Sequence, residues 1–163
     1  MTQGRSARVW WAQAFLVLTV AWLATLVAVP FALAHEVGGQ PATVVSAASY
    51  LVGTLICHQR PDRSFRLWGV QMPVCARCAG LYGGAALGAL VAGVWVSGRR
   101  RSAQGVSTLR WVVLGAAVPT GASVAMEALG VFEGSAVIRA AGAIPLGAAV
   151  TWVVSLVIRG ELA

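Results

Sequence analysis

Residues 9–34 of the chain read VWWAQAFLVLTVAWLATLVAVPFALA and contain no charged side chain. A helix that crosses the hydrocarbon core of a bilayer needs about 20 apolar residues, so this run predicts a transmembrane helix. Further runs of the same character occupy residues 79–96, 112–132 and 137–158. We therefore predict an all-α fold, a polytopic membrane helical bundle of about four transmembrane helices. A shorter apolar run at residues 42–56 predicts a re-entrant or interfacial helix, because it is too short to cross the bilayer comfortably.

The composition of the whole chain is that of a membrane protein. Of its 163 residues, 58% are hydrophobic and only 10% are charged, whereas an ordinary soluble domain carries about a quarter charged residues. No linker divides the chain, so residues 1–163 are predicted to form a single integral membrane domain in the lipid bilayer. The net charge of +7 comes from arginine, and the basic residues lie in short stretches between the apolar runs. A nucleic-acid reader would gather them in one patch with aromatic residues between them, so nucleic acid is not an expected partner.

Small residues follow one face of the second predicted span. Gly80, Gly84 and Gly88 have four-residue spacing, and Ala92 continues the series. Such a ridge lets the backbones of two transmembrane helices approach closely. The series therefore predicts tight packing of this helix against a neighbour.

Arginines in the loops indicate the orientation of the bundle. By the positive-inside rule, short loops rich in arginine lie in the cytoplasm. Residues 99–101 are consecutive arginines in the link between the second and third spans, and further arginines precede the first span and follow the last. We therefore expect a multi-pass protein of the bacterial cytoplasmic membrane with both termini cytoplasmic and the segment 35–78 extracytoplasmic. The sequence leaves the oligomeric state open.

The least membrane-like stretch, residues 55–82, reads LICHQRPDRSFRLWGVQMPVCARCAGLY and holds every cysteine of the chain. His58 follows Cys57, and Cys75 and Cys78 form a C-x-x-C pair just before the second span. A C-x-x-C pair places two thiolates within reach of one metal ion or of each other. A helix that begins at the pair also lowers thiol pKa values through its dipole.

Two chemistries use these residues. Cys57, His58, Cys75 and Cys78 can supply three sulfurs and one nitrogen to a tetrahedral zinc ion. Because two adjacent residues would both have to bind the metal, His35 or water can take the place of His58. An open fourth position would allow the metal to act in catalysis. Alternatively, the C-x-x-C pair is a redox disulfide that exchanges with Cys57 and passes electrons to a quinone or thiol partner. A static disulfide with one thiol left over is the third alternative, and no catalytic residue or reaction is identified.

Ionisable residues also occur in or near the last two spans. Glu127 lies in the third span and Arg139 near the start of the fourth. Charged residues inside spans are costly and usually paired, so we predict an ion pair between them. Its functional interpretation is a proton relay or an anion clamp beside the cysteines. A small transporter is a further alternative, but the chain shows no inverted repeat of the kind that many transporters carry.

The cysteine-bearing stretch resembles a known pattern. A C-H-Q-x-P-x-R-S-F block, followed by P-V-C-x-R-C-x-G-x-Y and a glycine-rich helix, is similar to an uncharacterised bacterial membrane protein family, domain of unknown function 2085. The resemblance covers residues 55–88 strongly and the last two spans more loosely. The matching residues are Cys57, His58, Gln59, Pro61, Arg63, Ser64, Phe65, Pro73, Val74, Cys75, Arg77, Cys78, Gly80 and Tyr82.

The resemblance implies that the cysteines act together with Arg63 and Arg77, but it implies no reaction, because the family has no established one. The family's pattern also places an acidic residue and a glutamine four residues apart in the third span, with an arginine at the start of the fourth. The corresponding residues here are Ser123, Glu127 and Arg139. The acidic side chain is therefore displaced by one helical turn.

Overall fold

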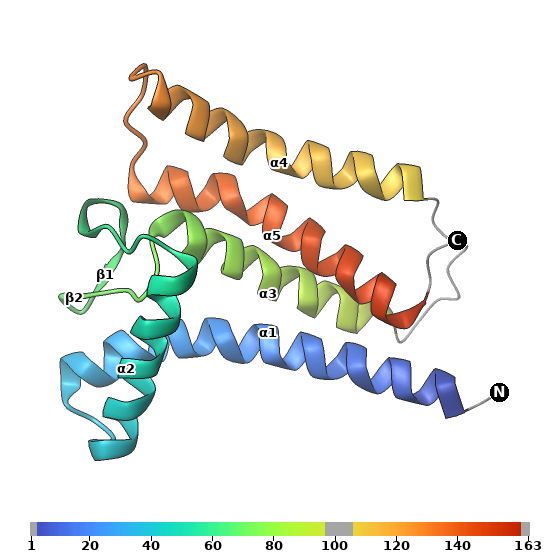
Figure 1. The fold of residues 1–163 in the computed structure, drawn as a ribbon, viewed down its shortest axis with the longest axis horizontal. Coiled ribbons are helices and arrows are strands. Elements are labelled where there is room, and N and C mark those ends of the chain that lie inside the picture. Colours follow the sequence, from blue (N-terminus) through green and yellow to red (C-terminus); the bar gives the residue numbers. More distant parts are fainter. Residues whose placement is uncertain (1–2, 97–105, 161–163) are drawn as a thin grey trace.

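The computed structural model describes residues 3–96 and 106–160, and this part of the chain is mostly helical, as predicted (Figure 1). Its elements, in chain order, are α1 Gln3–His35, α2 Gly39–Ile56, a 3-10 turn at Pro61–Arg63, β1 Arg66–Leu67, β2 Val70–Gln71, α3 Ala76–Val96, α4 Val106–Ala128 and α5 Ala136–Arg159.

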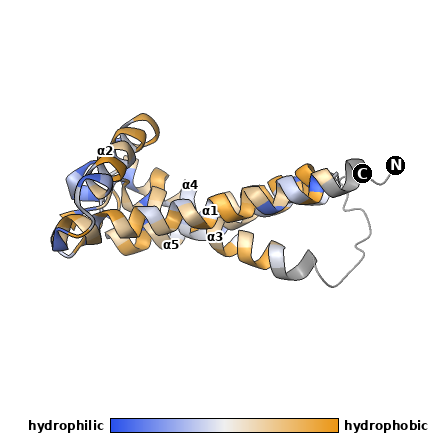
Figure 2. Cartoon of the chain, turned by 90° about the horizontal axis from the view of Figure 1, so that it is seen from below, coloured by the Kyte–Doolittle hydropathy of each residue, from blue (hydrophilic) through white to orange (hydrophobic). Residues whose placement is uncertain are grey.

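The four long helices lie side by side in the order α4, α5, α3 and α1 (Figure 1). The most extensive contact is between α3 and α5, while α4 packs on α5 and α1 packs on α3. The beginnings of α1 and α4 and the ends of α3 and α5 all lie at one end of the bundle. The other end carries α2 and the small hairpin. Figure 2 shows that the long helices are largely hydrophobic and that hydrophilic residues gather mainly at the end with α2 and the hairpin.

Direct backbone contact explains why α3 and α5 pack most closely. A methyl group on Gly80 would lie 2.0 Å from the carbonyl oxygen of Ala140, and one on Gly84 would lie 2.0 Å from that of Ile144. No side chain larger than hydrogen fits at these distances without moving a helix. The predicted tight packing of the glycine face is therefore confirmed, with α5 as the neighbour. Because α3 begins inside the C-x-x-C pair, this contact also fixes the position of the pair relative to α5.

The short helix α2 has an inverted distribution of polarity. Its buried residues are Ser46, Ser49 and Gly53. Its exposed large hydrophobic residues are Val44, Val45, Leu51, Val52, Leu55 and Ile56. A surface helix in water shows the opposite pattern, with its apolar stripe turned inward. The apolar outer surface of α2 is therefore suited to contact with lipid, while its placement as a re-entrant or interfacial helix stays a prediction.

Three helices in the described part of the chain are long and apolar enough to cross a membrane. They are α1 over Ala7–His35, α4 over Ser107–Ala128 and α5 over Ala136–Arg159. Within these described residues α3 is not among the candidate spans, so the predicted count of four spans is not confirmed. The arginines at 99–101, on which the predicted orientation rests, lie outside the described residues.

Candidate metal centre

The three cysteines converge at the end of the bundle that carries α2 and the hairpin. The sulfur atoms of Cys57, Cys75 and Cys78 all lie within 4.8 Å of one another. All three thiols are free; Cys57 is buried and the other two are half-buried. Leu26 of α1 and Tyr82 of α3 belong to the same hydrophobic cluster. The sulfurs are therefore enclosed by α1, α3 and the loop that joins α2 to α3.

A glutamine side chain ties the two ends of this loop together. Gln59 Nε2 donates hydrogen bonds to the carbonyl oxygen of Tyr50 at 2.8 Å and to that of Pro73 at 2.6 Å. These bonds link the last turns of α2 to the segment just before the C-x-x-C pair. Gly53 leaves the space for this clamp, since a methyl group there would lie 2.1 Å from Gln59 Nε2. The Gln59 clamp therefore brings the first cysteine and the C-x-x-C pair to one place.

The hairpin anchors the same loop to α1. Strands β1 and β2 are antiparallel, with Leu67 opposite Val70. Between them, Trp68 and Gly69 both have positive φ angles, 52° and 82°, as a two-residue hairpin turn of the primed type requires. The Trp68 ring packs edge-on against Phe31 of α1, with 5.2 Å between the ring centroids. This contact offsets the cost of a left-handed backbone at a bulky residue.

The surroundings of the sulfurs favour a thiolate. The backbone N–H of Cys75 donates to the sulfur of Cys57 at 3.2 Å. A hydrogen bond with the thiol of Cys78 lowers the pKa of Cys75 to about 5, although burial acts in the opposite direction. The thiolate is the form of cysteine that binds metals and attacks disulfides. A site with one ionised cysteine near neutral pH is therefore prepared for either chemistry.

Both histidines lie apart from the sulfurs. His58 is exposed, and among the described residues the group of converging ligand atoms contains the three sulfurs without it. Cys57 has an extended backbone, with φ −150° and ψ 144°, and successive side chains of an extended chain point to opposite sides. Burying the Cys57 thiol therefore turns His58 outward. His35 is also exposed, and its ring packs near those of Phe31 and Trp68.

Beside the cysteines, three arginines approach one carboxylate. Arg139 Nε donates to Glu127 Oε1 at 2.8 Å, and Arg77 Nη2 donates to the same oxygen at 3.2 Å. Arg63 Nη1 lies 4.0 Å from Glu127 Oε2, and Arg77 also donates to Ser123 Oγ at 3.2 Å. The structure thus contains the predicted pair of Glu127 with Arg139 and adds two arginines to it. We call Arg63, Arg77, Arg139 and Glu127 the arginine cluster.

Comparison with known proteins assigns the chain to a family. Residues 57–153 match the family described as "Predicted membrane protein (DUF2085)", which is more than half of the chain. The chain belongs to this family. The match begins at Cys57 and ends within α5, so the DUF2085 region includes the three sulfurs and the whole arginine cluster. The family description and the apolar helices together make this a membrane protein, which lies in a lipid bilayer.

Two relatives of this DUF2085 chain are archaeal. An uncharacterised protein of Methanocaldococcus jannaschii is 49% identical over 47 residues, which are 29% of this chain and 30% of the relative. An uncharacterised protein of Methanothermobacter thermautotrophicus is 53% identical over 30 residues, which are 18% of this chain and 27% of the relative. The chain thus matches less than a third of the length of each. These relatives do not support the expected bacterial origin, and no solved structure matches the chain.

The structure gives roles to DUF2085 motif residues that the sequence left without one. Gln59 is only a matching residue in the sequence, but its side chain is the clamp of the cysteine loop. A sequence signal for this role exists, because an amide side chain directly after an apolar helix is placed to bind carbonyl groups near the helix end. No comparable signal connects Arg63 with Glu127, which are far apart in the sequence and meet only through the packing of the long helices.

Proposed function

We propose that this protein is a four-span protein of the cytoplasmic membrane that holds a metal ion between Cys57, Cys75 and Cys78, with zinc as the favoured ion. The observation that carries the proposal is the convergence of the three sulfur atoms within 4.8 Å of one another. Sulfur ligands select zinc over the hard cations calcium and magnesium, which take oxygen ligands.

The spacing of the sulfurs fits such a site. Zinc–sulfur bonds of about 2.3 Å in a tetrahedron place the sulfurs about 3.8 Å apart, so small side-chain adjustments suffice. The N–H donor of Cys75 toward the sulfur of Cys57 is a contact that supports a metal-bound thiolate. Three thiolates and a divalent ion sum to a charge of −1.

The fourth position of the metal is the functional position under this proposal. Because His58 and His35 are both exposed, neither is placed with the sulfurs, and water or an outside ligand completes the tetrahedron. A zinc ion with an open position acts as a Lewis acid on whatever group binds there. The protein supplies the three sulfurs, the enclosure by Leu26 and Tyr82, and the loop held by Gln59.

The proposed fourth span is α3, and the proposed orientation has both termini in the cytoplasm. Arg8, Arg110 and Arg159 lie near the starts of α1 and α4 and at the end of α5, which share one end of the bundle. The positive-inside rule favours the cytoplasm for that end. The cysteines then face the extracytoplasmic side. A membrane-impermeant thiol reagent should label them in intact cells after metal removal, and labelling only after cell lysis would reverse the orientation.

Metal analysis of the full chain purified in a mild detergent tests the main proposal. We expect about one zinc ion per chain, lost when Cys75 and Cys78 are changed to Ser. The matched control is His58→Ala, which should retain the metal because this ring is not among the converging groups. A folded protein without metal would refute the proposal. Loss of zinc from the His58 variant would refute the three-sulfur ligand set.

Thiol–disulfide exchange is the second candidate function, favoured by the low pKa of Cys75 next to Cys78. In that reaction the two thiols become a disulfide and give two electrons and two protons to a quinone or to a partner disulfide. Trapping the thiols in cells separates the two functions. A redox protein shows two states that shift with oxidant and reductant, whereas a metal-bound centre stays in one state under both treatments.

A further inference from the structure

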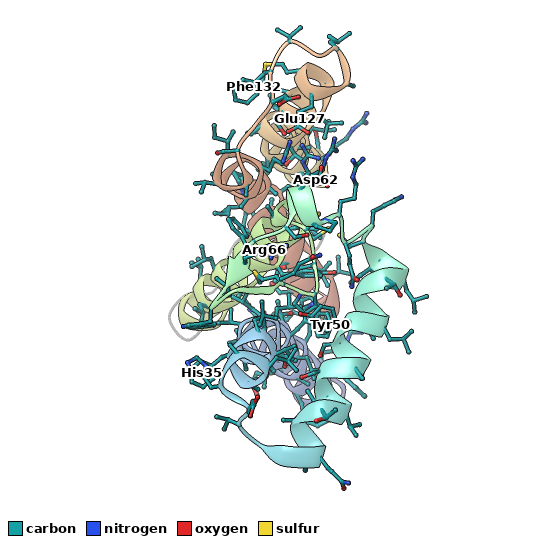
Figure 3. All side chains as sticks on the ribbon, turned by 90° about the vertical axis from the view of Figure 1, so that its left-hand side faces the viewer. His35, Tyr50, Asp62, Arg66, Glu127 and Phe132 are labelled. Carbon is teal, nitrogen blue, oxygen red and sulfur yellow. The ribbon has the colours of Figure 1, made fainter. Side chains whose placement is uncertain are left out.

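The arginine cluster carries more positive charge than its carboxylate neutralises. Three guanidinium groups contribute +3 and Glu127 contributes −1, which leaves +2. Asp62 lies 3.6 Å from Arg63 but is also paired with a further arginine at 3.3 Å, so it does not change this balance. Figure 3 looks at this end of the molecule and shows Glu127 and Asp62 close together with nitrogen atoms between them.

Two N–H donors of the cluster make no hydrogen bond. The Nε atoms of Arg63 and Arg77 are buried and make no hydrogen bond within the described part of the chain. Arg63 Nε lies 3.6 Å from Asp62 Oδ2, which is an ion-pair contact beyond hydrogen-bond distance, whereas no such contact is seen for Arg77 Nε among the described residues. Buried charged donors without an acceptor are destabilising, and native proteins rarely keep them without a reason. The excess charge and the unbonded Nε of Arg77 are independent observations, and both indicate that the cluster can bind an anion.

We propose that Arg63 and Arg77 bind a phosphate group of the monoester type, and that Arg139 and Glu127 hold Arg77 in position. Such a group carries a charge of about −1.5 to −2 near neutral pH, which matches the +2 of the cluster, whereas a carboxylate would leave half of it. Its several oxygens can accept hydrogen bonds from two planar guanidinium groups at once. Glu127 already accepts a hydrogen bond from Arg77 and lies 4.0 Å from Arg63. Its role is therefore to orient these arginines and to limit their affinity for the phosphate group.

The exposure of the three arginines indicates the side from which the anion arrives. The side chain of Arg63 is 41% exposed, against 23% for Arg77 and 11% for Arg139. The anion therefore approaches past Arg63, at the end of the bundle where α2 presents its apolar surface. Lipid headgroups and soluble phosphate compounds both reach this level of a membrane protein. The site does not require the metal ion, because none of the four residues belongs to the sulfur group.

Titration calorimetry on the full chain in an uncharged, phosphate-free detergent tests the proposal at constant ionic strength. One arm uses inorganic phosphate, and the other uses phosphatidic acid in mixed micelles, with a diacylglycerol of the same chains as its phosphate-free control. The variants are Arg63→Gln and the matched control Arg66→Gln, which removes the same charge from an exposed position in the same loop. Both variants change loop residues, so size-exclusion chromatography should show the wild-type fold in each.

We expect binding in at least one arm, and Arg63→Gln should weaken it about tenfold or more, since a hydrogen bond to a charged group is lost. Binding of inorganic phosphate identifies a soluble ligand, and binding of phosphatidic acid alone identifies a lipid headgroup. Glu127→Gln should tighten binding, because it removes the competing carboxylate, whereas a purely structural ion pair predicts no gain. Absence of binding in both arms, or an equal effect of Arg63→Gln and Arg66→Gln, would overturn the proposal.

Discussion

Replacing Gly84 by Ala tests the backbone contact on which the bundle depends. The added methyl group would lie 2.0 Å from the carbonyl oxygen of Ile144 and 2.8 Å from its carbonyl carbon and Cα. These are backbone atoms of α5, so no rotamer change relieves the contact. To restore an ordinary contact of 3.4 Å, the two helices must separate locally by 1.4 Å (3.4 minus 2.0). We therefore expect the variant to disturb the whole contact between α3 and α5.

The magnitude follows from the two helices that must move. Overpacking a tight interior typically costs about 1–3 kcal/mol, and the separation also weakens the dispersion contacts on both sides of Gly84. We expect a loss near the upper end, about 3 kcal/mol. Gly83 is the matched control, because it is the adjacent residue of the same helix and a methyl group there meets nothing within 4 Å. Gly83→Ala should be neutral or stabilise by at most about 1 kcal/mol through helix propensity.

Reversible unfolding of both variants in mixed micelles, with increasing denaturing detergent and circular dichroism as the readout, measures the difference. The two variants add the same methyl group, so differences in expression or hydrophobicity cancel. We expect Gly84→Ala to be less stable than Gly83→Ala by about 3–4 kcal/mol. Equal stabilities of the two variants would refute the description of the α3 and α5 contact.

Three further predictions concern the loop, the cysteines and the arginine cluster. Gln59→Leu should destabilise the protein by about 2 kcal/mol, since it leaves two carbonyl groups without their donor; protease protection of the loop reports the loss. In the metal-free protein, the alkylation rate of Cys75 should level off above about pH 6 and fall as the pH drops through the thiol pKa of about 5, because only the thiolate reacts. Arg139→Ala should destabilise by about 2 kcal/mol, because it removes the 2.8 Å charged donor to Glu127, which keeps its contacts with Arg77 and Arg63; thermal unfolding measures this.

Each of these predictions has a control in the same chain. Gln40→Leu changes an exposed glutamine of α2 and should leave the loop protected. Cys78→Ala removes the hydrogen bond that lowers the pKa of Cys75, so its alkylation profile should move to higher pH. Arg60→Ala breaks an exposed ion pair at 3.3 Å and should leave the stability nearly unchanged, because solvent screens the pair. The interpretation of the loop or of the arginine cluster fails if the variant and its control behave alike. The interpretation of Cys75 fails if Cys78→Ala has the same alkylation profile as the unchanged protein.

The apolar runs of the sequence predict which segments are helical, but not where the helices end. The predicted third span, residues 112–132, continues past the end of α4 at Ala128. Gly130 has a φ of 69°, the left-handed conformation that commonly ends helices, and Leu129 and Val131 then lie exposed outside the helix. Hydropathy alone assigns Leu129 and Val131 to the span. The helix nevertheless ends at Ala128, because Gly130 adopts a left-handed backbone conformation.

For the site, the sequence predicts the cysteines correctly as a group but not the direction of each side chain. The C-x-x-C pair lies at the start of a helix, and its spacing alone brings Cys75 and Cys78 together. The placement of Cys57 beside them depends on the loop, which the sequence pattern does not describe. The same loop geometry exposes His58, because adjacent residues of an extended segment cannot both face one point.

The Gln59 clamp closes the loop without using the thiols. A disulfide can also close a loop, as in small secreted domains, and its survival depends on the redox poise of the compartment. Here two hydrogen bonds from one amide close the loop, and all three thiols stay free. The closure of the loop is therefore independent of whether its compartment is oxidising or reducing, so the Gln59 clamp can hold the loop on either side of the membrane.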